Sequence, residues 1–155
     1  MQTSKGIEAA IEALQAGNLP LAEELCLQEK HRNPFDASIV DVLAMIHLQK
    51  GEGETALSKI NNALSMDNSQ ALFHNHLGII LKSLGRLEDA RSAYQDSLEL
   101  DPEAPDTLIN LALLCYDTGN LEECLRLGQL ATKLDPQNAS AFNNLATAYQ
   151  ELGRF

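Results

Sequence analysis

Five glycines stand at a constant spacing along the chain, and this spacing limits the folds open to it more than any other feature. Gly17, Gly51, Gly85, Gly119 and Gly153 follow one another at intervals of 34 residues. Glycine makes up about 7% of average sequences, so four such coincidences at a fixed period would arise roughly twice in 100,000 trials. A constant period of this length indicates a repeat array, in which each unit packs only on its neighbours.

The stretch around the third glycine shows the content of one unit. Residues 71–102 read ALFHNHLGIILKSLGRLEDARSAYQDSLELDP, two amphipathic helical segments on either side of Gly85, closed by Asp101-Pro102. Glycine adopts the left-handed helix cap at low cost, and the residue before a proline avoids helical angles. We therefore expect one solenoid domain over residues 1–155. Its helix–turn–helix units are predicted at 3–36, 37–70, 71–104 and 105–138, with the first helix of a fifth unit within 139–155.

Two of these units carry a recognisable signature. Its residues in the third and fifth units are Leu77, Gly78, Ala90, Tyr94 and Pro102, and Phe142, Leu145, Ala146 and Tyr149. They resemble the pattern W-x2-L-G-x2-Y, then A-x3-F, then P, of the tetratricopeptide repeat family. The resemblance implies an all-α fold, a right-handed α-solenoid of helix–turn–helix repeats with a 34-residue period. It also implies a scaffold that binds extended or helical peptides, and not an enzyme.

In that family, fixed positions on the first helix of each unit line a concave groove. The candidates that the resemblance places in a peptide-binding groove here are Met45, Asn75, Ile79, Lys82, Ile109, Asn110, Leu113, Tyr116, Asn143 and Asn144. The centre of this set is apolar, Lys82 is its sole base, and the acids around it are Asp41, Asp106, Asp117 and Glu151. We expect an apolar or amphipathic partner segment with basic flanks. Alternatively, the apolar positions pack between neighbouring helices.

Asparagines recur within the groove set. Asn110 and Asn144 share one repeat position, and Asn75 and Asn143 share the position before it. An amide side chain offers a donor and an acceptor side by side, which matches a peptide backbone. The set resembles part of the asparagine ladder in the superhelix of a protein glycosyltransferase, although solvated asparagines are the simpler interpretation.

A groove of the type that binds chaperone C-termini is not expected. Its Lys and Asn positions are occupied here by Ile7 and Ile11. Recognition of a carboxylate needs cationic donors, and Lys82 alone is poor provision.

Composition narrows the class of partner. The chain has 22 acidic and 11 basic residues, a net charge of −11, which argues against nucleic acid and against an anionic membrane surface. Part of the acidity, such as Glu88 and Asp89, falls where a second helix begins and complements the helix dipole. Three cysteines without a C-x-x-C motif fit a reducing compartment. We expect a cytoplasmic protein that binds protein or peptide.

The sequence offers no catalytic constellation. It has no glycine-rich phosphate loop, no Ser-His-Asp set and no paired-carboxylate cleft, and His74 and His76 lie two residues apart, on different faces of a helix. We expect no catalytic residue, no metal and no cofactor. Two alternatives to a free scaffold stay open. One is a substrate-recruiting N-terminal module of a larger enzyme, such as a glycosyltransferase or sulfotransferase. The other is self-association through an open C-terminal end, since solenoids need polar caps.

Overall fold

The computed structural model describes residues 5–151 and 153, and these form nine α-helices and no strand. The helices are α1 (Lys5–Gln15), α2 (Leu19–Arg32), α3 (Ala37–Gln49), α4 (Gly53–Met66), α5 (Ala71–Ser83), α6 (Leu87–Leu100), α7 (Pro105–Asp117), α8 (Leu121–Leu134) and α9 (Ala139–Glu151). The starts of α3, α5, α7 and α9 fall 34 residues apart, as do those of α2, α4, α6 and α8. The predicted all-α solenoid of helix–turn–helix repeats is confirmed.

The turns explain why glycine carries the period. Each glycine of the series has a positive φ, between 62° and 79°. The residue after it donates its backbone N–H to a carbonyl five residues back, as Arg86 does to Leu81 at 2.9 Å. This helix cap requires a left-handed residue, and glycine adopts that conformation without a Cβ penalty. The following helix then begins at once, and Asn18 caps α2 by accepting the N–H of Leu21 at 3.3 Å.

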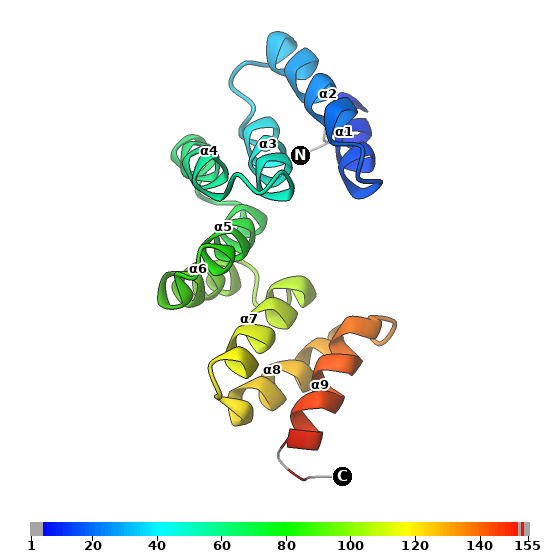
Figure 1. Ribbon diagram of the computed structural model, residues 1–155, viewed down its shortest axis with the longest axis vertical. Coiled ribbons are helices and arrows are strands. Elements are labelled where there is room, and N and C mark those ends of the chain that lie inside the picture. Colours follow the sequence, from blue (N-terminus) through cyan, green and yellow to red (C-terminus); the bar gives the residue numbers. More distant parts are fainter. Residues whose placement is uncertain (1–4, 152, 154–155) are drawn as a thin grey trace.

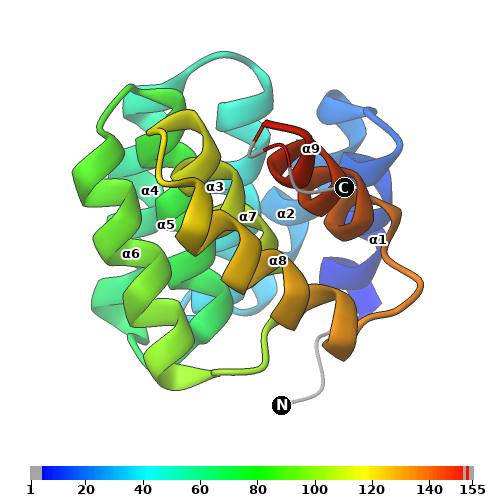
Figure 2. The same ribbon diagram turned by 90° about the horizontal axis from the view of Figure 1, so that it is seen from below.

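The helices form two rows that give the molecule its curvature. The first helices of the pairs, α1, α3, α5, α7 and α9, contact one another in succession, whereas α2, α4, α6 and α8 make no close backbone contact with each other over the described residues. The inner row is therefore the tighter one. In Figure 1 the chain describes a C with α1 and α9 at its ends, and Figure 2 shows the pairs turning about the long axis. The inner row supplies a concave face.

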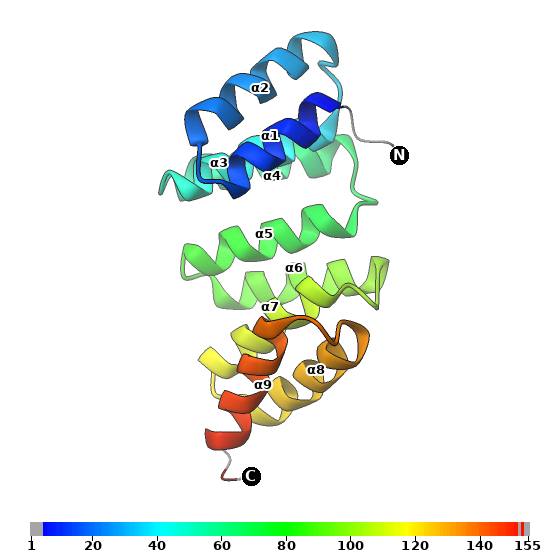
Figure 3. The same cartoon turned by 90° about the vertical axis from the view of Figure 1, so that its right-hand side faces the viewer.

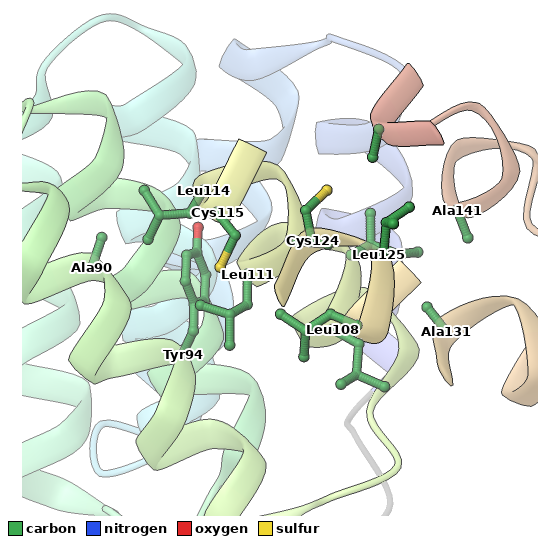
Figure 4. Packing of buried hydrophobic residues seen from close by; sticks show 14 of the residues in the cluster. Ala90, Tyr94, Leu108, Leu111, Leu114, Cys115, Cys124, Leu125, Ala131 and Ala141 are labelled. Carbon is green, nitrogen blue, oxygen red and sulfur yellow. The ribbon is translucent and has the colours of Figure 1, made fainter. Parts of the chain in front are cut away.

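The core is a ribbon of buried side chains that runs between the pairs. Tyr94 of α6, 1% exposed, belongs to a cluster with Leu111 and Leu114 of α7 (Figure 4). Within its own pair, Tyr94 lies so close to α5 that a Cβ at Gly78 would overlap its ring. The small residue of the signature is thus required by the approach of the two helices.

The outer face of α9 differs from its counterparts. Ala146 and Phe142 are exposed there, Phe142 to 48%. Ala112, at the position of Ala146 one unit earlier, is buried beneath α8. Among the helices that the structure describes, none is long and apolar enough to cross a membrane.

Candidate peptide-binding groove

An apolar row runs along the concave face. Met45 of α3, Ile79 of α5 and Leu113 of α7 occupy the same helical position at intervals of 34 residues, and each is partly buried against the core. Tyr116, one turn further along α7, is also partly buried. Each side chain therefore supports the packing of its own helix and leaves the rest of its surface open to the concave face.

Ile109 stands apart from the other apolar candidates. It is 7% exposed and belongs to the core cluster around Tyr94 and Leu111. Most of its apolar surface is therefore used in packing between α7 and its neighbours.

Polar side chains of the concave face pair across successive inner helices. The Nδ2 of Asn110 on α7 donates to the Oδ1 of Asn75 on α5 at 3.0 Å, and the Nδ1 of His76 lies 2.7 Å from the Oδ1 of Asp41 on α3. Both bonds join residues 35 apart in the sequence. Asp41 and Asn75 are buried, and a buried carboxylate or amide is costly unless it has such a partner.

A third cross-link of this kind involves the single lysine of the candidate set. Lys82 Nζ on α5 lies 2.7 Å from a carboxylate oxygen of Asp117 on α7, and both side chains are partly exposed. An ion pair in this setting contributes little to stability, about 0–1 kcal/mol. It does, however, neutralise the lysine locally, so that exposed acids such as Asp106 on α7 leave the face with a negative balance.

The asparagine candidates are not all brought together. Asn75 and Asn110 are bonded to each other, whereas Asn143 on α9 is exposed. The side chain of Asn144 lies outside the described residues. The paired asparagines and the ion pair share one rule that the sequence contains, namely the 35-residue offset between neighbouring inner helices.

A family model supplies the decisive comparison. The model described as tetratricopeptide repeat matches residues 42–105 and again 75–139, more than half of the chain. The chain belongs to the tetratricopeptide repeat family. Proteins of this family are typically non-enzymatic scaffolds, and the fold suggests protein–protein interaction. No curated protein matches the chain by sequence.

Solved structures of tetratricopeptide repeat proteins share the fold. One is a thermophilic protein from Thermus thermophilus, at a TM-score of 0.82 and 24% identity over 91% of this chain and 78% of that one. Another is Pseudomonas aeruginosa pilF, at 0.85 and 21% identity over 96% and 68%. A third is the first repeat domain of Spaghetti (RPAP3) bound to the HSP90 peptide SRMEEVD, at 0.72 and 16% identity over 76% and 94%.

The cysteines of this tetratricopeptide repeat chain lie in its core. Cys26, Cys115 and Cys124 are free and buried. Burial raises the pKa of Cys26 to about 11, and it raises the pKa of Cys115 and Cys124 as well, because it disfavours the thiolate. Thiols of this kind are poor nucleophiles and poor metal ligands. Among the described residues, no group of three or more His, Cys, Asp or Glu side chains is arranged to hold a metal ion.

One surface of this tetratricopeptide repeat solenoid was missed by the sequence reasoning. Phe35, Met66 and Leu72 are exposed and line a hollow at the edge where one repeat connects to the next, and we call this feature the edge hollow. A signal for it exists in the sequence. At the position of Phe35 the other units carry polar residues, namely Ser69, Glu103 and Gln137.

Proposed function

We propose that the chain is a scaffold whose concave face binds a peptide segment of a partner protein, apolar at its centre and basic at its flanks. The observation that carries the proposal is the row formed by Met45, Ile79 and Leu113, which repeats on successive inner helices and remains partly exposed. Apolar side chains in register on neighbouring helices suit a ligand that runs along the solenoid. Burying such surface on binding is worth about 25 cal/mol per Å².

Charge supports the basic character of the ligand. Lys82 is paired with Asp117, and the chain as a whole carries a net charge of −11. An acidic concave face attracts cationic segments and speeds their association. The acidic peptide SRMEEVD seen on the RPAP3 domain is therefore not the class of ligand that we propose here.

The asparagines supply the polar part of the proposed interaction. A side-chain amide has two N–H donors and an oxygen with two lone pairs, and the bond between Asn110 and Asn75 uses one donor and one lone pair. The remaining capacity is available to the backbone of a peptide. Asn143 and Asn144 on α9 would extend the same contacts along the face.

A second contact surface is favoured by the outer face of α9. Phe142 and Ala146 are exposed where the preceding inner helices are covered by a following helix. We propose that this face is covered either by a second copy of the chain or by further repeats of a larger protein, including an enzyme of the glycosyltransferase or sulfotransferase type. Light scattering of the chain and of Phe142→Ser separates these cases, because only self-association gives a dimer that the substitution removes. The cytoplasmic location is likewise proposed, from the three free cysteines.

The groove is tested with peptides selected from a random 12-residue phage library, using the full chain as bait. We expect Leu113→Asp and Tyr116→Ala to weaken the selected peptides roughly tenfold or more. Gln95→Asp, which adds the same charge on exposed α6, is the matched control and should leave the affinity unchanged. Circular dichroism checks that each variant is folded. Unchanged affinity in both groove variants would show that the peptide lies elsewhere.

A further inference from the structure

Three exposed apolar side chains meet at the edge hollow. Phe35 in the α2–α3 connection is 89% exposed, Met66 at the end of α4 is 38% exposed, and Leu72 in the first turn of α5 is 54% exposed. They line a space of about 760 Å³, which the buried ring of Phe73 also borders. Figure 3 shows the α2–α3 and α4–α5 connections on the same edge of the solenoid. Side chains from two successive repeat junctions thus form one apolar surface.

The repeat itself does not require apolar residues at this edge. The counterparts of Phe35 are Ser69, Glu103 and Gln137, and the counterparts of Leu72 in the second and fourth units are Ser38 and Asp106. Packing between units is therefore achieved elsewhere in the chain with polar residues at these positions. Apolar side chains that are gathered on the surface without a packing role mark sites of interaction.

The charges around the edge hollow are predominantly negative. Asp36 and Asp67 line it together with Arg32, whose guanidinium is already 2.7 Å from the carboxylate of Glu29. Hydrogen bonds from Ser69 and Gln70 lower the pKa of Asp67, which keeps this carboxylate ionised at neutral pH. Asp36 accepts the N–H of Ser38 at 2.9 Å, so its carboxylate is also fixed at the rim. A cation next to an apolar group complements this arrangement.

We propose that the edge hollow is a second binding site, for a protein segment that places an aliphatic or aromatic side chain between Phe35, Met66 and Leu72 and a lysine or arginine beside Asp36 and Asp67. The site lies at the repeat junctions and does not depend on binding in the concave groove. The apolar side chain supplies most of the affinity, and the cation selects the segments that bind.

Two methionines allow the edge hollow and the groove to be observed separately. Met66 lines the hollow and Met45 lies in the concave row, so the 13C-methyl methionine spectrum of the full chain reports each site with its own signal. The signals are assigned with Met66→Leu and Met45→Leu. The probe is a short synthetic peptide with one leucine between lysines in a glycine–serine background. Two matched peptides carry glutamate in place of lysine, or serine in place of leucine.

We expect the lysine–leucine peptide to shift the Met66 signal with saturation, and the glutamate and serine peptides to bind at least roughly fivefold more weakly. Phe35→Ser should weaken the lysine–leucine peptide roughly tenfold, since an exposed side chain is removed without disturbing the core. Leu100→Ser, an exposed apolar residue at the repeat position of Met66, is the control and should have no effect.

Three results would overturn this site. One is a Met66 signal that does not move while the Met45 signal does, which would leave the groove intact as a proposal. Another is equal binding of the lysine and glutamate peptides. The third is a Met66 signal that shifts with the concentration of the chain alone, which would make the hollow a contact between copies.

Discussion

Asn75 accepts a hydrogen bond from Asn110 at 3.0 Å, and the bond joins α5 to α7 on the concave face. Asn75 is 5% exposed, so its amide lies beneath the surface that a ligand would meet, while Asn110 is only partly buried. The pair therefore has a structural role in addition to the ligand contacts proposed for it. The two roles can be measured separately, because one concerns stability and the other affinity.

Removing the donor of this pair should destabilise the solenoid. Asn110→Ala leaves the buried Oδ1 of Asn75 without its partner, and we expect the free energy of unfolding to fall by about 1–3 kcal/mol. Urea unfolding followed by circular dichroism measures the change. Asn143→Ala, at an exposed asparagine of α9, is the control and should stay within about 0.5 kcal/mol of the unmodified chain. Equal effects of the two substitutions would mean that the pair contributes nothing.

The close approach of α5 and α6 should make Gly78 intolerant of a larger side chain. A Cβ at this position meets the ring of Tyr94, so Gly78→Leu should cost about 1–3 kcal/mol of stability through overpacking. The matched change is Ala146→Leu, at the equivalent position of α9, where the residue is exposed and the cost should be near zero. In a Tyr94→Leu background the penalty of Gly78→Leu should shrink. Thermal unfolding of the four variants tests this coupling.

The ion pair of Glu123 gives a pH dependence with a defined sign. The hydrogen bond from Arg126 lowers the pKa of Glu123 below its ordinary value of 4.5. A carboxyl group with a lower pKa in the folded state contributes stability that is fully present above pH 4.5 and is lost as the pH falls through the folded-state value. Glu123→Gln should therefore lose less stability on acidification in that window than the unmodified chain. Glu88→Gln in the first turn of α6 is the control, and urea midpoints across the acid range are the measurement.

The pairing of Lys82 predicts an unusual effect on affinity. In a groove that binds carboxylates, loss of its lysine weakens the ligand. Here Lys82→Gln frees the carboxylate of Asp117, and we expect it to strengthen lysine-rich library peptides roughly two- to fivefold at low salt, an advantage that added salt should reduce. Fluorescence anisotropy at two ionic strengths measures both effects. Weaker binding by Lys82→Gln would contradict the acidic character assigned to the face.

The repeat period made much of the fold predictable from the sequence. The glycine series placed the turns because only a residue without a Cβ adopts the left-handed cap cheaply, and all five glycines have a positive φ. Gly78, Ala90 and Tyr94 could be placed in the core because small and large residues alternate where helices cross. The division into one domain with five units remains a prediction, since helix positions alone do not define a folding unit.

The character of the concave face was harder to predict. Residue types at a groove position do not say whether a side chain will be used by the next helix, as Lys82 is by Asp117 and Asn75 by Asn110. Ile109 shows the same difficulty, because an apolar residue at that position is drawn into the core when its neighbours leave room. The edge hollow was missed because the family pattern directs attention to the inner helices, whereas Phe35 lies in a connection.

The position of a bound peptide on the solenoid is the central claim. The direct measurement is paramagnetic broadening of the methionine methyl signals by a library peptide that carries a nitroxide label at its centre. We predict that the Met45 signal broadens and that Leu113→Asp abolishes the effect at the same peptide concentration. A Met45 signal that stays sharp while the peptide is bound to the folded chain would contradict the concave face as the binding site.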